Sequence, residues 1–117
     1  MSPDAAKSTY RRMLDQVGEE ILVRRYTGTG SNRPKWDVAV QARVVDFEPQ
    51  EIIGTIVQGD RKIIALADDL LGAGLSLPIT TNDKIVVRGK ELAIMAADDS
   101  TRRVNGVLVA IEIQCRG

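Results

Sequence analysis

Apolar residues recur at helical spacing near the start of the chain. Four of them, separated by four, three and four positions, form one stripe: Ala6, Tyr10, Met13 and Val17. This spacing predicts a helix over residues 3–17 that packs one face against the rest of the protein. Ser2 is placed to cap the helix, Pro3 suits its first position, and Gly18 is placed to end it. We therefore expect an N-terminal helical segment at residues 1–18.

After this segment the apolar positions alternate, which is the period of strands that are buried on one face. The alternation predicts strands in five stretches and a hairpin in a sixth: 19–26, 36–48, 51–58, 61–67, 107–115 and the hairpin 84–96. The longest stretch is regular, with one side formed by Val38, Val40, Ala42 and Val44. A single helix followed by strands joined mainly by hairpins predicts a mainly β fold. We expect a small antiparallel barrel or sandwich of about six or seven strands over residues 19–117.

The stretch IVQGDRKIIA, residues 56–65, places an Asp and an Arg side by side between two apolar runs. Such a pair could serve chemistry, or it could belong to a turn. Only Gly59 and Asp60 separate the two predicted strands, and two residues of this kind form tight hairpin turns. We therefore predict a structural turn of Gly59, Asp60 and Arg61, in which Arg61 begins the return strand close to a carboxylate.

Two long stretches interrupt the strands. Residues 27–37 are rich in Gly, Ser and Asn and predict a loop, which includes Arg33 and Trp36. Residues 68–83 predict a short helical turn near 68–72 and then an extended loop. Four leucines belong to this second stretch: Leu70, Leu71, Leu75 and Leu77. Leucines in a long loop either fold onto the core or are held by a partner, and the sequence leaves both open.

Composition limits the possible chemistry. The chain has no histidine and one cysteine, Cys115, so it lacks Ser-His and Cys-His nucleophile pairs, His-ligated metal sites and any internal disulfide. Its carboxylate pairs are adjacent in sequence, and adjacent carboxylates rarely converge on one substrate. Gly28 and Gly30 lack the spacing of a phosphate-binding loop. We expect no enzyme activity, no cofactor and no metal.

Charge and hydropathy limit the possible partners. Sixteen basic and sixteen acidic residues cancel, so the chain lacks the basic excess of a dedicated nucleic-acid binder. Aromatic residues make up 3% of the chain, too few for the stacking surface of an oligonucleotide-binding barrel. No apolar run approaches the roughly 20 residues that cross a bilayer, so we expect no membrane partner. Arg11 and Arg12 lie off the helical stripe and are either solvated or in contact with a neighbouring subunit.

Four stretches, in order along the chain, resemble the neck proteins of tailed bacteriophages and prophages, the head–tail connector or head-closure (stopper) family. They are ILVRRYTGTG (21–30), GTIVQGDRKIIA (54–65), TTNDKIVVRGKELAIMA (80–96) and GVLVAIEIQCRG (106–117). The family tends to show Gln-Gly-Asp-Arg before a strand, Gly-Asp before a later hairpin, and Gln-x-Arg at the end of the closing strand. This chain departs at Asn82-Asp83, where Gly-Asp is common.

The resemblance implies a small β-barrel with an N-terminal helix that assembles with copies of itself into a ring. It implies a structural role in the virion neck, after assembly in the host cytoplasm, with portal or adaptor and tail-side neck proteins as partners. Packaged DNA would pass nearby without specific binding. The alternatives are another neck component, such as an adaptor or tail-completion protein, and a small nucleic-acid-binding barrel. The expected subunit or partner interface comprises Leu70, Leu71, Leu75, Leu77, Arg33, Trp36, Arg11 and Arg12.

Overall fold

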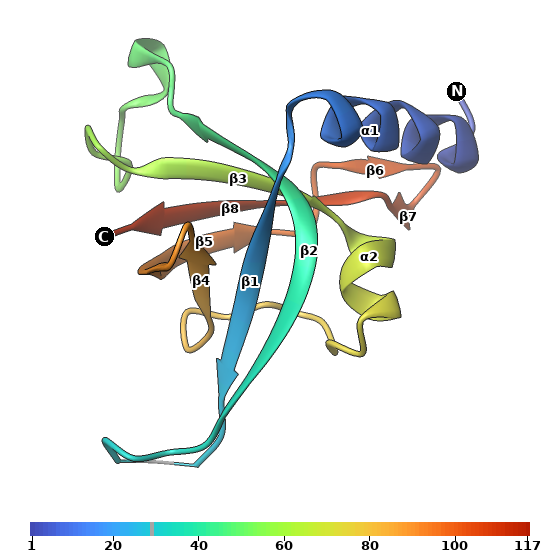
Figure 1. Ribbon diagram of the computed structural model, residues 1–117. Helices are drawn as coiled ribbons and strands as arrows, with labels where there is room; N and C mark the ends of the chain where they lie inside the picture. Colours follow the sequence, from blue (N-terminus) through green and yellow to red (C-terminus); the bar gives the residue numbers. More distant parts are fainter. Residues whose placement is uncertain (29) are drawn as a thin grey trace.

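Six strands close into an antiparallel barrel, and helix α1 (Pro3–Val17) lies beside it (Figure 1). The computed structural model describes residues 1–28 and 30–117; Thr29, inside the predicted loop 27–37, lies outside the described residues. The barrel strands are β1 (Glu19–Tyr26), β2 (Lys35–Asp46), β3 (Arg61–Leu66), β4 (Lys84–Val87), β5 (Lys90–Asp98) and β8 (Ala110–Arg116). Their order is β1-β2-β3-β8-β5-β4, and β4 pairs with β1 to close the barrel. The predicted mainly β class with one N-terminal helix is confirmed.

The barrel core follows from the alternation along its strands. On β2, Val38, Val40 and Ala42 are buried, while Ala39 and Gln41 between them are exposed. The other strands contribute mostly Ile, Val and Leu to the same cluster, which contains no aromatic side chain among its buried members. Close packing of these aliphatic side chains inside a closed sheet gives a rigid body with no free strand edge in the barrel.

Helix α1 is capped and buried on one side. The hydroxyl of Ser2 accepts a hydrogen bond from the backbone N–H of Ala5 at 3.1 Å, as the sequence predicts. The buried helical residues are Ala6 and Leu14, which form a second small core with Leu66 of β3 and Val109. Tyr10 and Met13 are partly buried beside them. The predicted stripe is wrong only at its end, since Val17 is 51% exposed and Leu14 takes its place.

The end of α1 requires a glycine for reasons of space. Gly18 has an ordinary backbone φ of −83°, so it does not use the left-handed conformation that often ends helices. A Cβ built on Gly18 would lie 2.5 Å from the carbonyl oxygen of Leu14. The chain passes so close to the last helical turn that only glycine fits.

The strand predicted at 51–58 is wrong. Its residues form a short 3-10 helix, η1 (Pro49–Glu51), followed by turns, in which the N–H of Ile56 donates to the oxygen of Ile53 at 3.1 Å. Strand β2 instead pairs directly with β3, with Asp46 opposite Arg61. Residues 47–60 therefore form a long loop, and the predicted two-residue hairpin at Gly59-Asp60 does not exist.

The later predictions hold with changes of detail. The helical turn near 68–72 is helix α2 (Ala67–Gly72), followed by an irregular segment up to β4. The hairpin 84–96 is the β4–β5 pair. The final strand is broken at Val109: β7 (Val107–Leu108) pairs with β6 (Arg103–Val104) beside α1, and β8 alone enters the barrel.

Candidate interaction site

Asp60 lies in the loop before β3, and its side chain is 0% exposed. Arg116 of β8 donates to its carboxylate through Nε at 2.7 Å and through Nη2 at 2.9 Å. Gln114, also of β8, donates through Nε2 at 2.8 Å, and the backbone N–H of Val57 donates at 3.1 Å. We call Asp60, Gln114 and Arg116 the Asp60 cluster. It ties the loop 47–60 to the last strand of the barrel.

The Asp60 cluster is ionised at any ordinary pH. Hydrogen bonds from Arg116 lower the pKa of Asp60 well below its ordinary value of 3.8, although burial acts in the opposite direction. The carboxylate in turn raises the pKa of the Arg116 guanidinium. Arg61 begins β3 opposite Asp46 of β2, and the cation that pairs with Asp60 is Arg116. A pair with no proton to exchange near neutral pH is structural rather than an acid or a base.

Asp83 has the equivalent place before β4. Arg25 of β1 donates to its carboxylate through Nε and Nη2, each at 2.9 Å, and the backbone N–H of Thr80 donates at 3.1 Å. The same guanidinium donates to the carbonyl oxygens of Ser76 at 2.9 Å and Pro78 at 3.3 Å. We call Arg25 and Asp83 the Asp83 cluster. It ties the segment between α2 and β4 to the first strand.

The two clusters lie at opposite ends of the barrel. Strand β1 runs antiparallel to both β2 and β4, and β2 runs antiparallel to β3, so β3 and β4 run in opposite directions. Asp60 precedes β3 and Asp83 precedes β4, which places one buried carboxylate at each end. Each end of the barrel therefore has one long loop fixed by a paired aspartate.

The structure corrects the interface prediction for two leucines. Leu70 and Leu75 are 0% and 1% exposed and belong to the barrel core, so they face no partner. Leu77 is half-buried against the same core, and only Leu71 is largely exposed. Of the two possibilities that the sequence leaves open, folding onto the core therefore applies to most of this segment. The reason is that α2 and the chain after it cover one end of the barrel.

Arg33 and Trp36 belong to an arm, the extension formed by the end of β1, the start of β2 and residues 27–28 and 30–34 (Figure 1, lower left). The guanidinium carbon of Arg33 lies 4.3 Å from the ring centroid of Tyr26, a cation–π contact. Trp36 continues the inward-facing row of β2 beyond the barrel and is 44% exposed. Its ring covers Gly74, where an added Cβ would lie 3.7 Å from the indole. Because successive residues of a strand point to opposite faces, Trp36 lies on one face of the arm and the Arg33–Tyr26 pair lies on the other.

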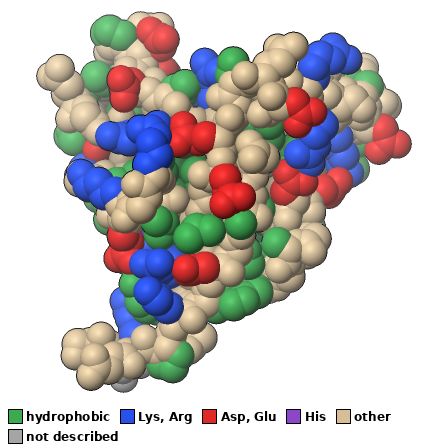
Figure 2. All heavy atoms as spheres, viewed as in Figure 1, with side chains coloured by type: hydrophobic (Ala, Val, Ile, Leu, Met, Phe, Trp, Pro, Cys, Tyr) green, Lys and Arg blue, Asp and Glu red, His purple; other side chains and the backbone are tan. Residues whose placement is uncertain are grey.

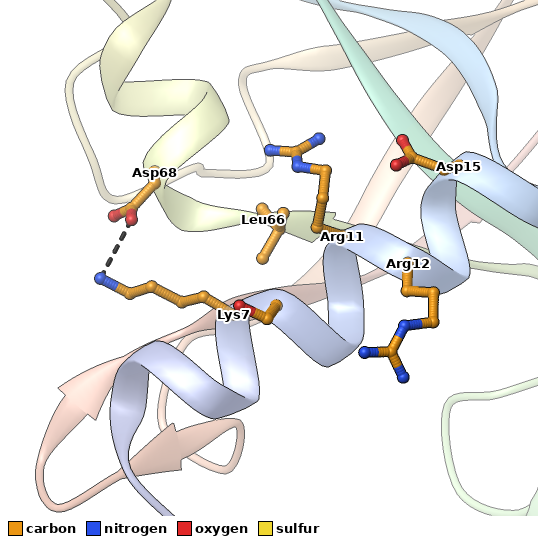
Figure 3. Close-up of a pocket in the computed structure, with 7 residues that line it drawn as sticks. Lys7, Arg11, Arg12, Asp15, Leu66 and Asp68 are labelled. Atoms are coloured by element: carbon orange, nitrogen blue, oxygen red, sulfur yellow. Dashed lines mark ion pairs between the residues drawn. The ribbon is translucent and has the colours of Figure 1, made fainter.

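Arg11 borders an open hollow of about 500 Å³ between α1 and the junction of β3 with α2 (Figure 3). Lys7 also borders it, and its Nζ lies 3.0 Å from a carboxylate oxygen of Asp68. Arg11 forms an ion pair with Asp69, and Arg12 also lines the hollow. The acidic residues of α2 neutralise two of these three cations. Arg11 therefore contacts its own chain and fixes α1 to α2.

The loop 47–60 carries an exposed apolar surface that the sequence analysis missed. Ile53 is 72% exposed and Val57 is 46% exposed. Asp46 and Glu48 are exposed where the loop begins. Hydrophobic and acidic side chains gather over this loop at the upper left of Figure 2. Because the strand prediction assigned these apolar residues to a sheet, it hid the surface that they form.

The remaining titratable groups have structural roles. Cys115 is buried in the barrel, and burial together with the charge on Asp60 raises its pKa to about 12, so its thiol stays protonated. Hydrogen bonds from Thr101 and Ser100 lower the pKa of Asp98 to about 2 and fix the loop after β5. No group of three or more His, Cys, Asp or Glu side chains in the described part of the chain could hold a metal ion.

The fold defines the class of this chain as a small closed β-barrel with a flanking helix and loops fixed by buried Asp–Arg pairs. No protein-family model matches the chain, and no curated protein matches it. Within residues 1–28 and 30–117, no helix is long and apolar enough to cross a membrane.

Proposed function

We propose that the chain is a structural neck protein of a tailed bacteriophage or prophage, of the head-closure (stopper) kind. In this role it forms a ring between the portal or adaptor and the tail. One observation carries the proposal: the charged residues in the four family-like stretches meet in pairs. Arg25 of the first stretch binds Asp83 of the third, and Asp60 of the second binds Gln114 and Arg116 of the fourth.

These contacts support the proposal because single short hairpin motifs are common among proteins. Several motifs whose side chains also bind one another in the folded chain are less common. The paired residues are 54 to 58 positions apart in the chain. They are also the residues through which the stretches resemble the family, namely the Asp of Gln-Gly-Asp-Arg and both ends of Gln-x-Arg. In this chain the four separate stretches therefore meet in two sets of tertiary contacts.

The proposed role is mechanical and breaks no bond. A closed barrel supplies a rigid body, and the buried clusters hold the loop 47–60 and the segment 73–83 in fixed positions at its two ends. Loops held in this way can contact neighbouring subunits without paying the full ordering entropy on assembly. A net charge of zero suits a protein that lies near packaged DNA and does not bind it tightly.

The proposal is tested in the phage or prophage that encodes the chain. Portal and major capsid genes are expected beside its gene. Deleting the gene should yield DNA-filled or leaking heads and separate tails in electron micrographs, with loss of infectious particles. Supplying the chain from a plasmid should restore infectivity, and a frame-shifted copy should not. Normal virions after deletion would overturn the proposal.

A binding assay separates the neck role from that of a nucleic-acid-binding barrel. The neck role predicts weak binding of duplex DNA with a shallow dependence on salt. Tight binding that falls steeply as salt rises would mean that many phosphates are neutralised, and it would favour the other class.

A further inference from the structure

Strands β2, β1 and β4 lie side by side, and their outer face is basic where it reaches the arm. The register places Lys35 opposite Tyr26 and Lys84 opposite Arg24, and the alternate residues of these strands enter the barrel core. The guanidinium of Arg33 stacks on the ring of Tyr26 and therefore lies on the same face. Basic side chains, with acidic ones beside them, lie above the tip of the arm at the lower left of Figure 2. We call Arg33, Lys35 and Lys84 the basic face.

The three cations of the basic face are not neutralised by carboxylates. None of them takes part in an ion pair within residues 1–28 and 30–117. The carboxylates on this part of the outer face are Asp37 and Glu91, and Arg24 binds both, at 2.9 Å and 3.0 Å. Together with Arg24, the basic face outnumbers these two carboxylates by four cations to two. This end of the barrel surface is therefore positive, although the whole chain is neutral.

The make-up of the basic face selects phosphate as its ligand. The centre of a protein–protein contact is apolar and depleted in lysine, and a membrane-binding face places apolar side chains beside its cations. The one largely exposed apolar side chain on β1, β2 and β4 is that of Trp36, which lies opposite Arg25 and so points to the other face. Phosphate requires only lysine and arginine, which neutralise its charge and release its counterions.

We propose that the basic face binds the phosphate backbone of duplex DNA without reading its sequence. The inference rests on the proposed function, which brings DNA next to the chain, and it names the side chains that meet the DNA. Lys35 and Lys84 are separated by two strand spacings and by two residues along the strands, roughly 12 Å. A duplex carries one charge per about 1.7 Å of its axis, so three phosphates lie within the span of these side chains.

Three phosphate contacts give weak binding with a shallow dependence on salt. At about 0.9 per contact, the logarithm of the association constant should fall against the logarithm of the salt concentration with a slope of about −2.7. Affinity should therefore fall about 12-fold between about 20 and about 50 mM salt. A ring multiplies the contact, because several copies would meet one duplex together. The weak binding that the neck role predicts is thereby assigned to one place on the barrel.

The test titrates a short duplex of mixed sequence into the isotope-labelled chain at low salt and follows the amide signals by NMR spectroscopy. Signals of β1, β2 and β4 next to the arm should shift as the duplex binds. The triple variant Arg33→Gln, Lys35→Gln, Lys84→Gln should lose the binding and keep the amide spectrum of a folded barrel. Lys84→Gln alone should make the salt slope shallower by about 0.9.

The matched control is the triple variant Arg12→Gln, Arg43→Gln, Arg61→Gln. It removes the same charge from cations on α1, β2 and β3 that have no ion pair in the described part of the chain. The control should bind within about twofold of the wild type, since only long-range attraction changes. Equal weakening of both triple variants would mean that net charge alone governs binding, and it would overturn the site.

Three other results would also overturn the proposal. The first is a wild-type chain that does not bind the duplex at about 20 mM salt. The second is a set of shifted signals confined to strands other than β1, β2 and β4. The third is tighter binding of anionic phosphatidylglycerol vesicles than of the duplex, which would assign the basic face to a membrane surface.

Failure of the basic face can be told apart from failure of the neck role. A chain that binds no duplex while its deletion still yields heads without tails would overturn the DNA site alone. A chain that binds the duplex through the basic face while its deletion leaves virions normal would overturn the neck role alone.

Discussion

Replacing Asp60 with Asn tests whether the buried cluster stabilises the fold. The substitution keeps the size of the side chain and removes its charge. Arg116 then loses an anionic acceptor, and the new amide group presents donors where Gln114 and Arg116 also present donors. We expect a folded but less stable protein.

The magnitude follows from the bonds that change. Asp60 accepts four hydrogen bonds, and two of them come from a guanidinium at 2.7 Å and 2.9 Å. Hydrogen bonds to charged groups contribute about 1.5–3 kcal/mol each, but Arg116 is 40% exposed and can regain water and keep its bond to Thr55. We therefore expect a loss of about 3 kcal/mol in the free energy of unfolding. For a chain of this length that loss lowers Tm by about 12 °C.

The pH dependence gives a second signature. The pKa of Asp60 in the folded state lies below its ordinary value of 3.8, so the ionised form stabilises the fold. This contribution is complete above about pH 5 and is lost as the pH falls below 3.8 towards the folded-state pKa. The difference in stability between the wild type and Asp60→Asn should therefore be constant near neutral pH and shrink in acid.

Urea denaturation followed by circular dichroism, repeated from pH 7 down to pH 2, measures both effects. The control is Asp99→Asn, since Asp99 is an exposed carboxylate in the loop after β5 and its side chain makes no hydrogen bond or ion pair among the described residues. The control should unfold within about 0.5 kcal/mol of the wild type. If Asp60→Asn matched the control, or if its deficit stayed the same in acid, the cluster would not stabilise the fold as argued.

Two further predictions concern the core. Replacing Leu75 with Ala should lower the free energy of unfolding in urea by about 3 kcal/mol because the side chain is 1% exposed, while the same change at the exposed Leu71 should cost less than about 0.5 kcal/mol. Equal losses at the two positions would contradict the burial of Leu75. Cys115 should resist a thiol reagent at pH 8 in the native protein and react fully in guanidinium chloride, because it is buried and its pKa is raised to about 12. Rapid labelling of the native protein would contradict that environment.

The fold class could be predicted because its determinants are local. Alternation along β2 specifies which side chains enter the barrel, and the cap at Ser2 marks the start of α1. The strand at 51–58 could not be excluded locally, since five β-branched residues in eight favour a strand by composition. Whether residues 51–58 form a strand depends on β2. Because β2 pairs directly with β3, with Asp46 opposite Arg61, residues 51–58 have no partner strand in the barrel.

The candidate site was harder to predict than the fold. Gly59 and Asp60 indicated a turn before β3, although the predicted two-residue hairpin was wrong, and the burial of Asp60 depends on Arg116, 56 positions later in the chain. A Gly-Asp pair in front of a strand has the same sequence whether the carboxylate faces water or a guanidinium. Sequence patterns of short range therefore indicate a turn here and contain no information on its distant partner.

The two buried clusters can be understood together. The Asp60 cluster fixes the loop that carries the exposed side chains of Ile53 and Val57. The Asp83 cluster fixes the segment that contains Gly74, on which the indole of Trp36 rests. Buried ion pairs contribute little net stability compared with apolar packing, and they are best justified where they hold one geometry against its alternatives. The proposed neck role requires contacts of fixed geometry, and the two aspartates fix one loop at each end of the barrel.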